Sequence, residues 1–441
     1  MLYAVSLTGG LIPQTPCVAT LRSPFDSSFY KTPGAGLGHQ NGFWVSNGPV
    51  LGLSGTIMAN PCPPPPQKTR QGSESHGKRQ KRVITGYSAH TKTQFHKELR
   101  PNPEKMIIFG INYLKMKRLL LLLSTALLLM CCQARQGWVR VEGNKFVDAQ
   151  GKELVFRGLC FSDPVKLVND GQWTERYFEE AASWGANVVR FAVHPANINK
   201  MGWEKTFEVM DQGIEWAEKH GMYVIMDWHS IGNLKEELYT NPMYNTTKEE
   251  TFRFWRTAAS RYKDTPTVAL YEIFNEPTVT GTGECSWTEW KELQEQIIDT
   301  VRTYNPKAVC LCAGFNWAYD LTPVASEPIG RPNVAYVCHP YPMKRPQPWE
   351  EQWEKDFGYV ADTYPVICTE IGYCLEDEPG AHIPVISTDV YGEHITKYLE
   401  SKGISFTVWC FDPHWAPTLI SDWDFTPTTQ GRVFKQYLQG L

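Results

Sequence analysis

Residues 267–277 read TVALYEIFNEP, a nearly continuous apolar run that closes on the polar pair Asn275 and Glu276. A run of this kind, without alternation of apolar and polar residues, is typical of a parallel strand that is buried on both faces. Seven further runs share these features. They cover residues 154–161, 186–194, 223–229, 308–315, 333–341, 365–373 and 404–412.

Helix signals separate these runs. Segments 174–184 and 205–220 end at glycines, Ser286 and Glu289 predict a capping box, and 388–402 ends at Gly403. Eight strand–helix units in about 300 residues predict an α/β fold, the (β/α)8 TIM barrel. An open doubly wound sheet is the alternative, but that fold normally carries a glycine-rich phosphate loop after an early strand, and the sequence has none.

The amino-terminal part of the predicted domain carries a further signal. Residues 139–157, with a turn at 148–151, predict a β-hairpin that caps the bottom of the barrel. From residue 135 to residue 441 the composition does not change and no linker occurs. We therefore expect one catalytic barrel over residues 135–441.

Residues 116–134 resemble a secretory signal peptide, with a short basic start, an aliphatic run and small residues before Ala134. Residues 1–115 are rich in Gly, Pro and Ser and lack an apolar period, so we interpret them as a non-native or disordered upstream extension. The alternative is a disordered cytoplasmic arm before a signal anchor. We expect a monomeric secreted or cell-envelope protein. A soluble form and a form lipid-anchored at Cys131 or Cys132 are the alternatives.

Charge narrows the class of substrate. The chain has a formal net charge of −4, and residues from 135 onwards hold 28 Lys and Arg against 43 Asp and Glu. An acidic body without a basic stripe argues against binding of nucleic acid.

Polar residues follow several predicted strands at the end where barrel enzymes carry their chemistry. Two of them, Glu276 and Glu370, come from the fourth and seventh strands, which face each other across the mouth of the barrel. Two carboxylates that flank one bond are the catalytic pair of glycoside hydrolases. A separation of about 5 Å predicts retention of configuration, and about 6.5–9.5 Å predicts inversion. Arg190, on the second strand, could keep one carboxylate ionised.

With these residues, segment 138–441 resembles the catalytic domain of glycoside hydrolase family 5, the cellulase and mannanase family. The whole set of site residues of that family has a match in the expected order. The matches are Arg190, His229, Asn275, Glu276, His339, Tyr341, Glu370 and Trp409.

The resemblance implies a role for each residue. Glu276 would be the general acid and base and Glu370 the nucleophile, oriented by Arg190 and Tyr341. Asn275 would bind the sugar 2-hydroxyl.

The resemblance also implies that His229 and His339 position the sugar and the acid, and that Trp409 forms the stacking floor. No third His or Cys stands at ligand spacing, so we expect no metal, and the mechanism requires no cofactor.

Four tryptophans at or beyond strand ends are candidates for further sugar-stacking subsites. They are Trp228, Trp317, Trp415 and Trp423. Tryptophans spaced in this way would line an open trough, and an open trough suits cleavage inside long polysaccharide chains. We therefore expect an endo-β-1,4-glucanase that acts on cellulose-like or mixed-linkage β-glucan. A mannanase, a xylan- or xyloglucan-active enzyme, and a carbohydrate-binding protein without catalysis are the alternatives.

Overall fold

The computed structural model describes residues 115–118, which are helical, and residues 136–440. The predicted upstream extension, the apolar part of the signal peptide, its cleavage site and both lipid-anchor cysteines lie outside these ranges. Within the described ranges, no helix combines the length and the apolar character that crossing a bilayer requires.

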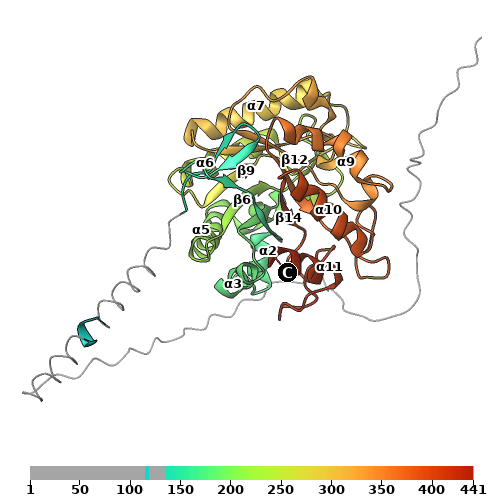
Figure 1. The fold of residues 1–441 in the computed structure, drawn as a ribbon. Coiled ribbons are helices and arrows are strands. Elements are labelled where there is room, and N and C mark those ends of the chain that lie inside the picture. Colours follow the sequence, from blue (N-terminus) through green and yellow to red (C-terminus); the bar gives the residue numbers. More distant parts are fainter. Residues whose placement is uncertain (1–114, 119–135, 441) are drawn as a thin grey trace, which may run out of the picture. The chain divides into compact units, whose positions relative to one another are not determined.

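Eight parallel strands of this part of the chain close into a barrel (Figure 1). The strands are β4 (Arg157–Phe161), β5 (Val188–Val193), β6 (Tyr223–Trp228), β9 (Val268–Glu272), β11 (Val309–Ala313), β12 (Val334–Val337), β13 (Val366–Ile371) and β14 (Ser405–Val408). Each strand lies within one of the eight apolar runs, and β14 pairs with β4 to close the cylinder. The predicted TIM barrel is confirmed.

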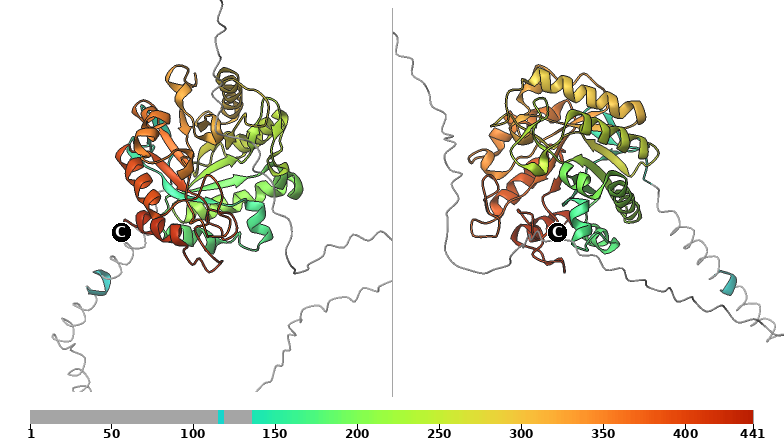
Figure 2. Two further views of the ribbon diagram at one scale, coloured as in Figure 1. Left: turned by 90° about the vertical axis from the view of Figure 1, so that its right-hand side faces the viewer. Right: turned by 180° about the vertical axis from the view of Figure 1, so that it is seen from behind.

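Helices surround the barrel, as the two turned views show (Figure 2). The α-helices are α2 (Pro164–Asn169), α3 (Glu175–Ser183), α4 (Pro195–Met201), α5 (Trp203–Lys219), α6 (Lys248–Arg261), α7 (Trp287–Tyr304), α8 (Phe315–Ala318), α9 (Glu350–Asp356), α10 (Asp389–Ser401) and α11 (Thr429–Leu438). Short 3-10 turns are η1 (Pro242–Tyr244), η2 (Thr322–Ala325), η3 (Pro342–Lys344) and η4 (Gly358–Asp362). The capping box predicted at Ser286 begins α7. A second one, Thr247 with Glu250, begins α6.

Alternation along the strands creates two separate cores. Val189 and Val224 belong to the large cluster between barrel and helices, whereas Val188 and Ile225 belong to a cluster inside the barrel. Successive side chains of a strand point to opposite faces, so both faces of each strand must be apolar. This requirement explains why the strands read as continuous apolar runs.

The barrel interior changes character towards the carboxyl ends of the strands. The lower layers are aliphatic, but the next inward positions carry Arg190 on β5, Asp227 on β6 and Glu272 on β9, all fully buried. The ladders place Asp227 beside Glu272 and Cys160 beside Arg190. A buried charge is stable only when it is paired, so this layer must form a network.

Two small sheets lie outside the barrel ladder. Where a hairpin was predicted at residues 139–157, residues 140–154 form a three-stranded antiparallel sheet of β1 (Arg140–Glu142), β2 (Lys145–Val147) and β3 (Glu153–Leu154), and Arg157 already belongs to β4. Its Val141 backbone bonds to Asn333, just before β12. The second sheet joins β7 (Ile231–Asn233), β8 (Leu238–Tyr239) and β10 (Glu276–Pro277). The sequence analysis did not predict this second sheet.

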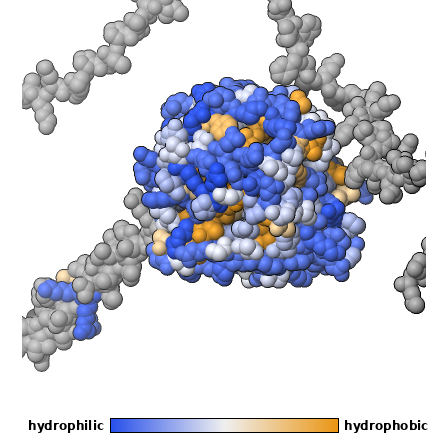
Figure 3. All heavy atoms as spheres, turned by 90° about the horizontal axis from the view of Figure 1, so that it is seen from above, coloured by the Kyte–Doolittle hydropathy of each residue, from blue (hydrophilic) through white to orange (hydrophobic). Residues whose placement is uncertain are grey.

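The surface of this part of the chain is largely hydrophilic in the view of Figure 3, with separate smaller apolar areas. Among the described residues, large hydrophobic side chains that remain exposed include Ile383 and Met343.

Candidate active site

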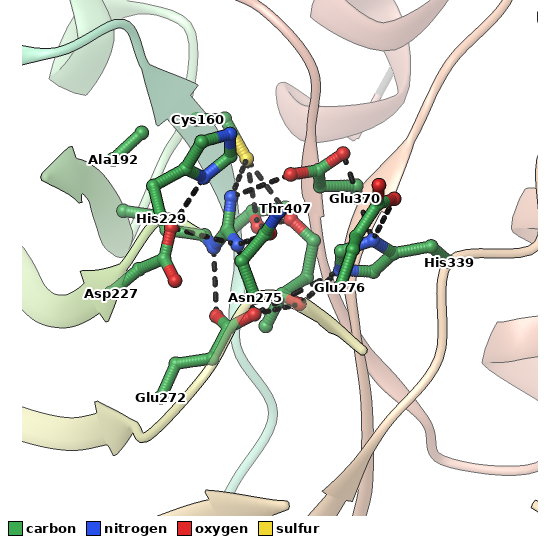
Figure 4. Close-up of polar contacts among 12 residues, drawn as sticks. Cys160, Ala192, Asp227, His229, Glu272, Asn275, Glu276, His339, Glu370 and Thr407 are labelled. Carbon is green, nitrogen blue, oxygen red and sulfur yellow. Dashed lines mark hydrogen bonds and ion pairs between the residues drawn. The ribbon is translucent and has the colours of Figure 1, made fainter. Parts of the chain in front are cut away.

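Glu276 and Glu370 meet at the carboxyl end of the barrel. Glu276 lies in β10, whose backbone pairs with β7, and Glu370 lies in β13. One oxygen of each carboxylate and one ring nitrogen of His339 lie within 4.8 Å of one another. Figure 4 shows the two carboxylates side by side next to His339. Glu276 is 8% exposed and Glu370 is 5% exposed, so both reach the surface of the site.

Arg190 is the centre of the charge network beneath these carboxylates. Its Nε and Nη2 atoms bind the two oxygens of Glu272 at 2.7 and 2.8 Å, and its Nη1 binds Glu370 at 2.9 Å. Its Nη2 also lies 3.0 Å from Asp227. Burial disfavours the charged guanidinium, but these three carboxylates outweigh burial and raise the pKa of Arg190. Arg190 is therefore a permanent cation.

Two of the three carboxylates bound by Arg190, Glu272 and Glu370, differ in environment. Burial would raise the pKa of Glu272, but the charge of Arg190 outweighs it, and the pKa is lowered. Burial raises the pKa of Glu370, opposed by His339, by Arg190 and by the Tyr341 hydroxyl, which donates to Glu370 at 2.8 Å. Glu272 is thus the fixed counter-ion, whereas Glu370 is the group whose charge can change.

His339 connects three acidic residues. Its Nδ1 lies 2.9 Å from Glu276 and 3.7 Å from Glu370, and its Nε2 lies 2.9 Å from the Thr369 hydroxyl. That hydroxyl donates to Glu272 at 3.0 Å. Burial disfavours charge on the ring, but the negative charges of Glu370, Glu272 and Glu276 raise the pKa of His339 to about 10. The imidazole of His339 is therefore in its protonated, cationic form next to Glu276.

His229 forms the opposite wall. Its Nδ1 lies 2.6 Å from Asp227, and its ring stacks on Trp409 at 5.3 Å with an interplanar angle of 10°. Burial lowers the pKa of His229, and electrostatic interactions with His194, Arg190 and His339 lower it further. A neutral imidazole is thus fixed by Asp227 against the face of an indole. Burial raises the pKa of Asp227.

The side-chain NH2 group of Asn275 has no hydrogen-bond acceptor among the described residues. Its Oδ1 accepts from Arg190 Nη2 at 2.6 Å, which fixes the orientation of the amide. Its Nδ2 has no hydrogen-bond partner among the described residues, although the side chain is buried. An unpaired buried donor costs stability, so its retention points to a ligand that accepts from it.

These contacts bring all eight predicted site residues into one connected group. The prediction for the outlying tryptophans is partly wrong. Trp228 is fully buried, stacks on Phe254 at 4.4 Å and donates to Thr251. It follows the inward-facing Asp227, so it points to the outer core and cannot line a sugar subsite.

The other three tryptophans remain half-buried at the carboxyl end. Trp415 stacks on Trp409 at 6.1 Å, and Lys166 lies over both Trp415 and Trp423 at 5.5 and 5.3 Å. Trp317 lies in α8, under the ammonium group of Lys344.

Sequence reasoning did not identify three residues of the site. Glu272 and Asp227 support Arg190, and Tyr244 lies 6.3 Å from the ring of His229. Burial and the charges of Glu276 and Glu370 raise the pKa of Tyr244 to about 12. A charged residue inside an apolar strand must have a partner, so Glu272 and Arg190 could have been paired from this signal alone.

Glu276, His339 and Glu370 also offer three donor atoms at a spacing that a metal ion could bridge. Each of these groups is already engaged within the site: Glu276 with His339, and Glu370 with Arg190 and Tyr341.

Comparison with curated proteins finds endoglucanases. Endoglucanase A of Butyrivibrio fibrisolvens is 29% identical over 211 residues, which are 46% of each chain. The chain thus spans about half the length of that relative. An endoglucanase of Paenibacillus polymyxa is 25% identical over 342 residues, covering 65% of this chain and 84% of the relative.

Comparison with solved structures agrees. A β-glucanase from Saccharophagus degradans, solved in complex with cellotetraose, is 47% identical with a TM-score of 0.68, covering 69% of this chain and 94% of that chain. The catalytic domain of a Thermobifida fusca endoglucanase shares the fold at 21% identity and a TM-score of 0.56, with coverages of 69% and 98%. The family described as "Cellulase (glycosyl hydrolase family 5)" matches residues 147–414. Since that match covers more than half of the chain and includes every residue of the carboxylate network, the chain belongs to glycosyl hydrolase family 5.

Proposed function

We propose that the protein is a secreted, retaining endo-β-1,4-glucanase that hydrolyses internal bonds of cellulose-like or mixed-linkage β-glucan. The observation that carries this proposal is the approach of Glu276 and Glu370 to within 4.8 Å, with each of them reaching the surface. A gap of about 5 Å suits direct attack by one carboxylate and leaves no room for a water molecule between carboxylate and sugar, as inversion requires.

In the first step, a Glu370 oxygen forms a bond to the anomeric carbon while the bond to the leaving oxygen breaks. Glu276 gives the leaving oxygen a proton. Glu276 shares this proton with His339 at 2.9 Å, and Glu276 is the partner that reaches the surface. Arg190 and Tyr341 hold Glu370 at both of its oxygens and orient it for attack.

In the second step, a water molecule attacks the anomeric carbon and gives its proton to Glu276. The bond between the sugar and Glu370 breaks, and both carboxylates return to their starting states. The free Nδ2 of Asn275 would donate to the sugar 2-hydroxyl, a bond that strengthens in the transition state.

The aromatic residues give the substrate its path. Trp409, held parallel to His229, would form the floor at the point of cleavage, and Trp415 extends this surface. Trp423 and Trp317 would stack on sugars further along the chain. The Saccharophagus degradans relative was solved with cellotetraose, which supports β-glucan as the substrate class.

Reducing-sugar release and viscosity on four polymers test this proposal. Carboxymethyl cellulose and barley β-glucan should be hydrolysed, with a rapid loss of viscosity because cuts fall inside the chain. Mannan and xylan should be poor substrates. Faster hydrolysis of mannan than of both glucans, or release of single sugars from chain ends without a loss of viscosity, would contradict the proposal.

A further inference from the structure

Three consecutive residues at the mouth of the barrel adopt a left-handed backbone conformation. They are Asn316 with φ 60° and ψ 47°, Trp317 with φ 55° and ψ 60°, and Ala318 with φ 55°. None of them is glycine, and a side chain with a β-carbon disfavours this region. A strained turn persists only where its surroundings hold it, and such turns are concentrated at functional sites.

Hydrogen bonds from the segment that follows β12 stabilise the turn. The Lys344 ammonium group donates to the carbonyl of Asn316 at 2.8 Å, and the backbone N–H of His339 donates to the carbonyl of Ala318 at 2.9 Å. The two carbonyls that flank Trp317 are thus bound by the chain that follows β12. Lys344 also lies over the Trp317 ring at 4.9 Å, a cation–π contact.

The turn lies beside the strand that carries Glu276, the proposed acid. Helix α8, which contains the turn, packs against β10, which contains Glu276. His339 contacts Glu276 through its ring and the turn through its backbone. Because Glu276 protonates the leaving oxygen, sugars on the leaving-group side must pass this turn.

We propose that Lys344 is a positioning residue that fixes Trp317 as the stacking surface for the leaving-group sugars. The inference rests on the proposed glucanase function. Lys344 acts through Trp317 rather than on the reacting atoms: its hydrogen bond holds the strained turn, and its charge lies against the indole. Without the ammonium group the turn loses one of its two carbonyl anchors, and the indole loses its fixed orientation.

The experiment compares two substrates that differ only on the leaving-group side. Cellotetraose places glucose units beside Trp317, whereas β-cellobiosyl fluoride has a single atom as its leaving group. Lys344→Met should lower kcat/KM for cellotetraose by about tenfold and leave the fluoride within about twofold of the wild type. Lys344→Arg, which keeps a charged donor, should recover most of the loss. Equal losses on both substrates, or none on either, would overturn the proposal.

A matched control separates this effect from general damage. Lys307 lies over Trp138 at 4.4 Å, another lysine–tryptophan contact, and this one lies at the opposite, amino-terminal end of β11. Lys307→Met should leave both substrates unchanged. Thermal unfolding of each variant shows whether it is folded; if Lys344→Met unfolds, Lys344→Leu, which also has no hydrogen-bond donor, takes its place with the same expected outcome.

A double-mutant cycle tests whether Lys344 acts through Trp317. If it does, adding Lys344→Met to Trp317→Ala should change kcat/KM for cellotetraose by less than about twofold, because the orientation of an absent ring has no effect. Additive losses would overturn the proposal. Failure of the wild type to hydrolyse either substrate would instead overturn the proposed function, so the two failures are distinguishable.

Discussion

Arg190 and Glu272 form a bidentate ion pair in the interior of the barrel, with Nε–Oε2 and Nη2–Oε1 distances of 2.7 and 2.8 Å. Both side chains are fully buried. The pair places a guanidinium directly beneath Glu370, which Arg190 binds with its remaining Nη1 atom. The position of the proposed nucleophile therefore depends on a carboxylate that is not in contact with the substrate.

The first prediction concerns this pair. Glu272→Gln keeps the shape of the side chain but leaves the buried Arg190 undercompensated, so it should lower the free energy of unfolding by about 3–5 kcal/mol. Denaturant unfolding measures the loss. Glu249→Gln, at an exposed pair with Arg256, is the matched control and should leave the free energy of unfolding almost unchanged. Similar small changes in both variants would show that the buried pair does not stabilise the barrel.

The second prediction concerns pH. Glu370 must be ionised to attack, and burial raises its pKa, so the acid limb of kcat/KM should lie above the ordinary range of a glutamate. The Tyr341 hydroxyl favours the charged form and lowers this pKa. Tyr341→Phe should therefore move the acid limb to higher pH. Tyr398→Phe, which removes a hydrogen bond to Glu354 outside the barrel, should leave the limb in place. A shift to lower pH in Tyr341→Phe would contradict the assignment.

The third prediction separates the two carboxylates. Glu370→Ala should reduce turnover of every substrate by several orders of magnitude, since no bond to the enzyme can form. Glu276→Ala should slow cellotetraose hydrolysis by about 10²–10⁴-fold, the scale of general acid catalysis. On dinitrophenyl cellobioside, whose leaving group needs no proton, it should still give a burst of dinitrophenol. A burst from Glu370→Ala and none from Glu276→Ala would reverse the roles.

The fourth prediction distinguishes two tryptophans. Trp228→Ala should lower the free energy of unfolding by about 3–5 kcal/mol, the usual cost of truncating a large buried aromatic residue, with little change in KM. Trp415→Ala should raise KM for barley β-glucan and change stability far less. Calorimetry and initial rates measure the two effects. A raised KM in Trp228→Ala with no loss of stability would restore Trp228 as a subsite residue.

Much of the fold could be predicted because burial on both faces imposes a simple pattern. The strands of a parallel barrel need apolar residues at every position, so all eight were visible as runs, and the polar residues after them marked the open end. The capping residues of α7 were also visible. These features depend only on residues that are near each other in the chain.

The rest depends on direction and on partners far apart in the chain. Trp228 and His229 are neighbours, but only His229 faces the site, because the inward positions of β6 are Ile225 and Asp227. Counting alternation from Asp227 would have excluded Trp228. The role of Glu272 depends on contact with Arg190, 82 residues earlier. The left-handed turn at 316–318 contains no glycine that would reveal it in the sequence. Its support comes from Lys344 and from the backbone of His339, which are more than twenty residues further along the chain.

In the proposed mechanism Glu276 and Glu370 act together by double displacement. Proton NMR of cellotetraose hydrolysis by the wild-type enzyme tests this mechanism, because it records the configuration of the newly formed reducing end before its anomers interconvert. The new reducing end should appear first as the β-anomer, because two successive inversions at the anomeric carbon restore its configuration. Initial release of the α-anomer would contradict it, since a single displacement by water would then be the mechanism.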